Sequence, residues 1–166
     1  MSRYRGPRVK RMRALGVDLP GLSRKTRERR PSPPGEHGEM RRRKESDYKR
    51  QLKEKQKLRY NYGIGERQLR ILVAKARSSK TETGKKIIEL IERRLDNVVF
   101  RAGYARSIPA ARQLVSHGHF CVNGRKTDIP SFSVREKDVI TLRDRSKKAK
   151  TNLQIVDEAL ESLHLP

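Results

Sequence analysis

Apolar side chains recur with a helical period through the middle of the chain. The first helix is expected from Ser46, a residue type that caps helices, to about Asn61, with Gly63 as its stop. Its faces are mostly basic, so this helix lies against either solvent or phosphate groups. A second helix is expected to begin at Gly65, and its apolar stripe consists of Leu69, Leu72, Val73 and Ala76.

The strongest helical pattern covers residues 84–102. The spacing of its apolar residues predicts one continuous helix that Gly103 ends. A shorter helix follows, which Ser107 caps and in which Pro109 occupies the first turn, with Gly118 just beyond its end. The inward-facing positions of this shorter helix are Ile108, Ala111, Leu114 and Val115.

After the shorter helix the apolar period changes to two. Phe120 and Val122 precede Asn123-Gly124, the preferred dipeptide of a type I′ hairpin turn. A further strand is expected at residues 139–142. The pattern therefore predicts an α+β protein, with a helical N-terminal domain followed by a small helix–helix–hairpin module.

The first 45 residues carry no sustained apolar period. They are rich in basic residues, and residues 19–38 are rich in Pro and Gly. Such a segment has few apolar groups to offset its ordering entropy, so an extended basic arm that becomes ordered on its partner is expected. The predicted organisation is an arm at 1–45, a helical domain at 46–92, an RNA-binding module at 93–150 and a C-terminal helix at 151–166.

The charge of the chain indicates its class of partner. Among 166 residues there are 42 Lys or Arg and 19 Asp or Glu, which gives a net charge of +23. Small soluble domains need a net charge of only about 2–8, so the excess indicates nucleic acid, an anionic membrane or an acidic protein as partner. Aromatic residues make up only 5% of the chain. A folded RNA recognised by shape is therefore favoured over a single strand bound by stacking.

Candidate sites of other kinds are weak. His117, His119 and Cys121 alternate as metal ligands on one face of a strand would, but three ligands without a fourth make a poor structural zinc site. The single Cys excludes an internal disulfide framework, and no apolar run has the length of a membrane span. No catalytic residue, metal or cofactor is predicted. Pairing with basic neighbours on the helix surface is expected for Glu89, Glu92 and Asp96.

The two helices and the hairpin of the module can form one basic ridge, to which the helices contribute Arg106, Arg112, Gln113 and His117, and the hairpin Asn123, Arg125 and Lys126. Guanidinium groups bind phosphate oxygens, while Gln, Asn and His can read base edges or 2′-hydroxyl groups. Arg112 is expected to point away from the core. Its replacement by Ala is then expected to change stability by less than about 0.5 kcal/mol while weakening RNA binding.

Several segments resemble a known family. Arg94–Gly103, Ala110–His119 and Val122–Arg125 resemble the RNA-binding module named after the fourth protein of the small ribosomal subunit, which also occurs in tRNA synthetases and pseudouridine synthases. Ser2–Arg8, Pro34–Gly38, Ser46–Tyr48 and Glu54–Arg59 are similar to the ribosomal protein family itself. The order of these segments, over nearly the whole chain, favours the ribosomal family.

The resemblance implies a structural protein that binds small-subunit rRNA directly and nucleates assembly of the subunit body. It also implies a contribution to decoding accuracy with a neighbour, the fifth protein, and to the path by which mRNA enters. The rRNA contacts that the motifs imply are Arg3, Tyr4, Arg5, Arg8, Lys55, Lys57, Arg59, Arg94, Arg101, Arg106, Arg112, Gln113, His117, Asn123 and Arg125. The residues expected at the mRNA entrance are Arg41, Arg42, Arg43 and Lys44.

The sequence departs from the family in two ways. Some members carry an N-terminal Cys cluster that holds zinc, whereas this chain has none there, so no metal is expected. The family also continues for several tens of residues beyond the position of Pro166. Since the motif begins at the initiator Met, the ribosome of a bacterial cytoplasm, or of a plastid that makes the protein itself, is the expected location.

Two alternatives stay open at this point. An RNA-modifying enzyme with the same module would need a catalytic domain, and no stretch of this chain is long enough for one. An RNA chaperone that acts outside the ribosome would not need the N-terminal motifs, which belong to the ribosomal family.

Overall fold

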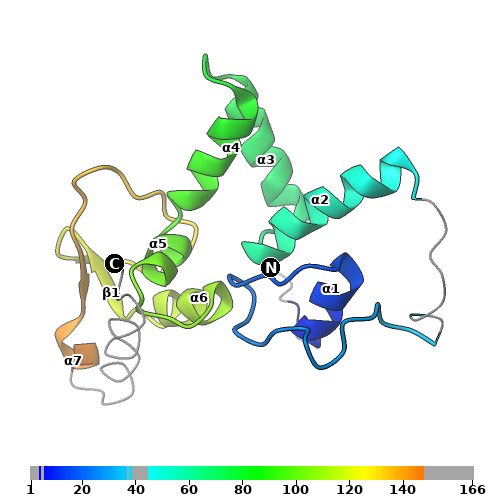
Figure 1. The fold of residues 1–166 in the computed structure, drawn as a ribbon. Helices are drawn as coiled ribbons and strands as arrows, with labels where there is room; N and C mark the ends of the chain where they lie inside the picture. Colours follow the sequence, from blue (N-terminus) through cyan, green and yellow to red (C-terminus); the bar gives the residue numbers. More distant parts are fainter. Residues whose placement is uncertain (1–3, 5, 37, 39–44, 148–166) are drawn as a thin grey trace, which may run out of the picture. The chain divides into compact units, whose positions relative to one another are not determined.

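The computed structural model describes residues 4, 6–36, 38 and 45–147 (Figure 1). The chain forms two compact units, residues 1–64 and 65–166, which are described one at a time. The helix expected at 151–166 lies outside the described residues. Within the described part, helices combine with a small antiparallel sheet, which confirms the α+β class.

The first unit contains a small core where an extended arm was expected. Helix α1 covers Arg8–Leu15 and ends at Gly16, whose φ of 72° is left-handed. Met12, Leu19 and Leu22 are buried together. The expectation of too few apolar groups is wrong for this segment, because the three side chains come together through the helix and the following turns without a regular period.

Helix α2, Asp47–Asn61, begins and ends where the sequence predicts. The Ser46 hydroxyl accepts a hydrogen bond from the Lys49 backbone N–H, and Gly63 follows with a φ of 61°. No residue of α2 is buried, as expected for a helix with mostly basic faces. Tyr60 packs against the Met12 cluster, so the helix is attached to the core at its C-terminal end.

The second unit starts with two neighbouring helices, α3 (Glu66–Arg77) and α4 (Thr83–Glu92), which pack against each other (Figure 1). Gly65 is the N-cap of α3, as predicted. Leu69 and Ala76 of α3 and Ile91 of α4 are buried.

The single helix expected over residues 84–102 is two helices, α4 and α5 (Leu95–Arg101). Arg94 has an extended backbone with ψ of 139° and bridges to Ser133. The Leu95 N–H donates to the Phe132 carbonyl at 2.9 Å, and the Val134 N–H donates to the Arg93 carbonyl at 2.8 Å. A continuous helix was the wrong prediction, because a distant segment provides backbone partners at this point that an apolar period cannot show.

Helix α6 and the hairpin follow the sequence closely, whereas the last described helix was not predicted. Helix α6 covers Ile108–Ser116, with the Ser107 hydroxyl as its cap and Pro109 in its first turn. Strands β1 (Phe120–Val122), β2 (Arg125–Lys126) and β3 (Ile140–Leu142) form an antiparallel sheet in the order β2-β1-β3. Asn123 and Gly124 have φ of 50° and 77°, which fits the predicted type I′ turn. A short helix, α7, covers Asp144–Lys147.

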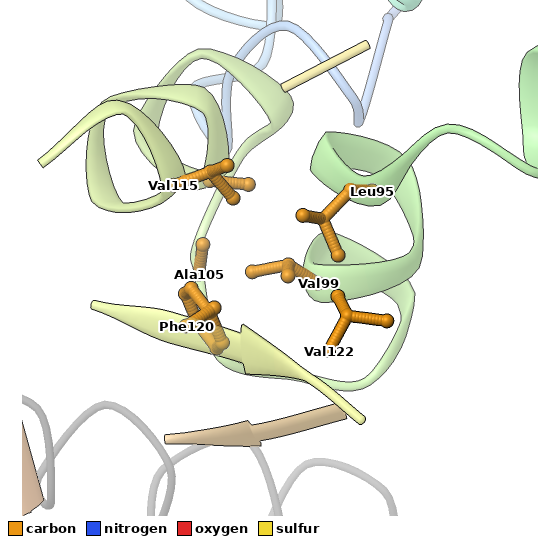
Figure 2. Close-up of a cluster of buried hydrophobic side chains, with 7 residues drawn as sticks. Leu95, Val99, Ala105, Val115, Phe120 and Val122 are labelled. Carbon is orange, nitrogen blue, oxygen red and sulfur yellow. The ribbon is translucent and has the colours of Figure 1, made fainter. Parts of the chain in front are cut away.

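One apolar core joins α5, α6 and the sheet. Figure 2 shows side chains of the two helices and of β1 pointing toward one another. Phe120 is fully buried and meets Tyr104 edge to face, with ring centroids 5.5 Å apart. This core fixes the positions of the exposed side chains on α6 and on the hairpin. Its buried members are Leu95, Val99, Ala105, Ala111, Val115, Phe120 and Val122.

Candidate nucleic-acid interface

The module is organised around one buried carboxylate. Asp96, whose side chain is 1% exposed, accepts hydrogen bonds from Arg94 at 3.0 and 2.7 Å. It also accepts two from Arg112 of α6, at 3.1 and 2.8 Å. Charged groups taken out of water need such partners. The cluster therefore ties the start of α5 to α6.

This cluster corrects two predictions. Arg112 does not point away from the core: its side chain is 18% exposed, and its guanidinium faces Asp96. Asp96 does not lie on a helix surface either. Residues two positions apart do not face each other in a helix, so the pairing of Arg94 with Asp96 requires the break before α5. The sequence carried no signal for that break.

Other predicted residues of α5 and α6 are exposed. Gln113 lies on α6, His117 is the C-cap of this helix, and Arg106 precedes its N-cap. Arg101 at the end of α5 has a side chain that is 63% exposed and donates to the Glu92 carboxylate at 2.8 Å. All four residues are exposed to solvent.

The hairpin lies next to the end of α6. A Cβ added at Gly118 would meet the Lys126 side chain at 2.4 Å, so this side chain covers Gly118 directly. Gly118 has a φ of 71°. The contact places the exposed Lys126 beside His117, with Arg125 next along the strand. A cation at this position also suits the negative end of the helix dipole.

The side-chain amide of Asn123 links the hairpin turn to residues 138 and 139 through both its oxygen and its nitrogen. Its Oδ1 accepts from the Val139 N–H at 2.9 Å, and its Nδ2 donates to Asp138 at 2.8 Å. The Asp138 carboxylate also accepts from the Arg135 N–H at 2.7 Å. The Arg135 N–H, followed by the Asn123 amide, lowers the pKa of Asp138 below its ordinary value. This arrangement, the Asn123–Asp138 clasp, occupies the amide that was expected to read RNA.

In the first unit, Tyr4 makes a cation–π contact with Arg11. The Arg11 guanidinium lies 3.2 Å from the centre of the Tyr4 ring and 4.1 Å from that of Tyr60. Arg8 is exposed, and its guanidinium donates to the Leu22 carbonyl at 3.3 Å. Stacking of this kind is worth about 0.5–1 kcal/mol at exposed sites. The sequence placed Tyr4 and Arg8 among the candidates but gave no reason to single out Arg11.

The predicted basic residues of α2 lie on or near the surface. Lys55 is exposed, Lys57 donates to Glu54 at 2.6 Å and Arg59 donates to Gln56 at 3.2 Å. The predicted contacts that lie outside the described residues are Arg3, Arg5, Arg41, Arg42, Arg43 and Lys44.

The exposed basic residues that the sequence analysis did not name include two that follow strand β3. Arg143 and Arg145 follow β3, and the Arg143 N–H donates to the His119 carbonyl at 2.9 Å. Their position beside β1 depends on the pairing of β3 with β1. Only the overall charge could have indicated them, since pairing between distant strands is not visible in one sequence.

Of the three residues weighed as metal ligands, His119 has a hydrogen-bond partner within the described residues. The His119 ring nitrogen Nδ1 lies 2.9 Å from the Ser146 hydroxyl, and the His117 and His119 ring centres are 6.2 Å apart. Within the described ranges, no group of three or more His, Cys, Asp or Glu is placed to hold a metal ion.

The described helices include none with the length and hydropathy of a membrane span.

Both parts of the chain match models of known protein families. Residues 3–92 match the ribosomal protein S4/S9 N-terminal domain, and residues 93–140 match the S4 domain. Small ribosomal subunit protein uS4 of Methylobacillus flagellatus is 58% identical over 161 residues, which cover 96% of this chain and 77% of that protein. Protein uS4B of Nitrosomonas europaea is 56% identical over 166 residues, covering 99% and 79%. Protein uS4 of Synechocystis sp. is 54% identical over 168 residues, covering 99% and 82%.

Proposed function

Because this chain belongs to the family of small ribosomal subunit protein uS4, we propose that it is a structural component of the small ribosomal subunit that binds rRNA directly. The observation that carries the proposal is the 58% identity over 96% of the chain, which includes both family domains. The net charge of +23 provides the electrostatic basis. The role involves no catalytic step and no cofactor, and its place is the ribosome of a bacterial cytoplasm or of a plastid.

The exposed basic and polar side chains of the module form the proposed RNA contact, which we call the module surface. It consists of Arg101, Arg106, Gln113, His117, Arg125 and Lys126. Arg94 and Arg112 act on RNA indirectly, since their guanidinium groups hold Asp96. Asn123 shapes the turn through the Asn123–Asp138 clasp.

The N-terminal part supplies further proposed contacts. The resemblance assigns rRNA contacts to residues of the arm and of α2, which are Arg3, Tyr4, Arg5, Arg8, Lys55, Lys57 and Arg59. The exposure of Tyr4, Arg8 and Lys55 supports this assignment. Phosphate contacts of this kind set orientation and affinity, while the exposed Gln113 and His117 of the module surface can add base or 2′-hydroxyl contacts.

The finer roles are part of the same proposal. Early binding to rRNA would nucleate assembly of the subunit body, and contact with the fifth protein would contribute to decoding accuracy. The basic run at residues 41–44 would line the mRNA entrance. A chaperone acting outside the ribosome and an RNA-modifying enzyme are not favoured, because the relatives are ribosomal proteins over nearly the whole chain.

The proposal is tested by filter binding to transcribed small-subunit rRNA, with large-subunit rRNA as competitor. The double variant Arg106→Gln/Arg125→Gln removes two charges from the module surface, and Arg70→Gln/Arg77→Gln removes two exposed charges from α3. The module variant should bind about tenfold more weakly than the α3 control, since charge-assisted contacts are the stronger ones. Equal losses in the two variants, or no preference for small-subunit rRNA, would contradict the proposal.

A further inference from the structure

Glu92, the last residue of α4, contacts one face of α5. Its carboxylate accepts a hydrogen bond from the Arg101 guanidinium at 2.8 Å. The Asn97 amide nitrogen donates to the Glu92 backbone carbonyl at 3.3 Å and also to the Glu92 carboxylate. Asn97 and Arg101 are four positions apart in α5, so they lie on the same face of that helix. One carboxylate therefore contacts both residues, and we call these three residues the Glu92 cluster.

The two partners of the carboxylate differ in burial. Asn97 is 1% exposed, whereas the side chain of Arg101 is 63% exposed. The carboxylate is therefore held on its inner side by a buried amide, and it contacts a solvent-exposed guanidinium on its outer side. A long side chain loses rotamer freedom when a partner immobilises it. An Arg101 side chain that is already restrained by Glu92 has less of this freedom to lose when it binds RNA.

The charge of Glu92 is unfavourable for an RNA-binding surface. Glu92 contacts a residue of the module surface, where its carboxylate repels phosphate groups. An exposed ion pair contributes little to the stability of a fold, so the pairing with Arg101 is not explained by stability. A role in orienting the Arg101 guanidinium explains why a carboxylate is present at this position.

We propose that Glu92 is a positioning residue, which holds the Arg101 guanidinium in the orientation in which it meets an RNA phosphate. The inference rests on the proposed function and assigns a role in it to an acidic residue. Arg101 is the group that contacts RNA, and Glu92 acts through it. Asn97 fixes the carboxylate from the buried side.

The test compares Glu92→Ala with Glu92→Gln by filter binding of the full chain to small-subunit rRNA. Both variants remove the same negative charge, so they relieve the same repulsion of phosphate. Gln keeps an oxygen that accepts from Arg101. Its amide nitrogen can donate to Asn97 Oδ1, which has no hydrogen-bond partner within the described residues, once the Asn97 amide turns over. Glu92→Ala should bind about three- to tenfold more weakly than Glu92→Gln, because its Arg101 side chain is no longer restrained.

Two controls separate positioning from other effects. In an Arg101→Gln background, the two substitutions at Glu92 should differ in affinity by less than about twofold, since no guanidinium is left to position. Glu89→Ala removes another carboxylate of α4, which contacts Lys86 and Arg93 instead, and it should not weaken rRNA binding. Circular dichroism melts show whether each variant folds. If Glu92→Ala does not fold, Glu92→Leu takes its place, since it fills similar space without an acceptor.

Equal rRNA affinities of the Ala and Gln variants at Glu92 would overturn the inference. A difference that persists without Arg101 would overturn it too, because the effect would then act through the fold. In either case, binding of small-subunit rRNA by the wild-type chain leaves the proposed function standing. Failure of the wild-type chain to bind this rRNA counts against the proposed function itself.

Discussion

Asp96 is the residue that most directly fixes how α5 and α6 pack in the module. It receives four hydrogen bonds from two guanidinium groups while being nearly inaccessible to water. The two Arg residues come from different elements, one before α5 and one within α6. Removing either therefore leaves a buried charge with half its partners.

We expect Arg112→Ala to lower the free energy of unfolding by about 3 kcal/mol, because breaking a buried pair on one side costs roughly 3–5 kcal/mol and Arg94 still partners the carboxylate. Urea denaturation measures this change. The exposed neighbour Gln113→Ala should change stability by less than about 0.5 kcal/mol. If Arg112→Ala is as stable as Gln113→Ala, the Asp96 cluster does not have the structural role described here.

The clasp at Asp138 predicts a pH dependence. The lowered pKa of Asp138 means that its contribution to stability is present above the ordinary carboxyl pKa and is lost as the pH falls through the folded-state value. Asp138→Asn should therefore show a weaker loss of stability than the wild type between about pH 5 and about pH 2. Urea midpoints across this range measure the difference. Parallel curves for the two proteins would rule out this linkage, and the exposed Glu136→Gln serves as the control.

At the scale of elements, residue types at helix caps and turns correctly predicted the structures that depend only on neighbouring residues. The caps at Ser46 and Ser107 begin helices through their own hydroxyl groups, and the Asn123-Gly124 turn follows from backbone preference. The break at Arg94 depends on backbone groups of residues 130–134, and the core around Met12 depends on turns. Neither leaves a periodic trace in the sequence, which is why the long helix and the extended arm were predicted wrongly.

The hairpin turn gives a prediction at this scale. Gly124 has a φ of 77° and no atom within 4 Å of an added Cβ, so Gly124→Ala is penalised by backbone conformation alone. We expect a loss of about 1–2 kcal/mol in the free energy of unfolding. Gly84→Ala, in the first turn of α4 with ordinary contacts, should instead raise stability by up to about 1 kcal/mol. Effects of the same sign in urea denaturation would contradict the left-handed turn.

At the scale of the whole molecule, the fold class and the class of partner were both predictable, because charge and hydrophobic period are summed over many residues. The orientation of single side chains was not. Arg112 and Arg106 have the same chemistry, yet one faces a buried carboxylate and the other is exposed. Tertiary contacts decide whether an Arg side chain is exposed or paired inside the fold. The candidate RNA contacts predicted from sequence therefore included residues of both kinds.

Salt dependence tests the electrostatic basis of RNA binding. With a net charge of +23, the logarithm of the rRNA affinity should fall linearly with the logarithm of salt concentration, with a slope of roughly several units. Arg106→Gln/Arg125→Gln should reduce the magnitude of that slope by about 1–2, since each phosphate contact contributes about 0.7–0.9. Filter binding over a range of KCl concentrations measures the slope. A slope near zero would refute the electrostatic basis.

The Asn123–Asp138 clasp also affects the chemical stability of the Asn123-Gly124 turn. In an Asn-Gly pair, the Gly backbone nitrogen can attack the Asn side-chain carbonyl carbon, ammonia leaves, and the cyclic imide then hydrolyses to Asp or isoaspartate. Asn is thermolabile for this reason. Here hydrogen bonds at 2.9 and 2.8 Å hold both ends of the Asn123 amide, so the side chain is restrained from swinging toward the nitrogen of Gly124. We therefore expect the clasp to slow deamidation of the turn, a reaction that would add a negative charge beside the basic strand β2.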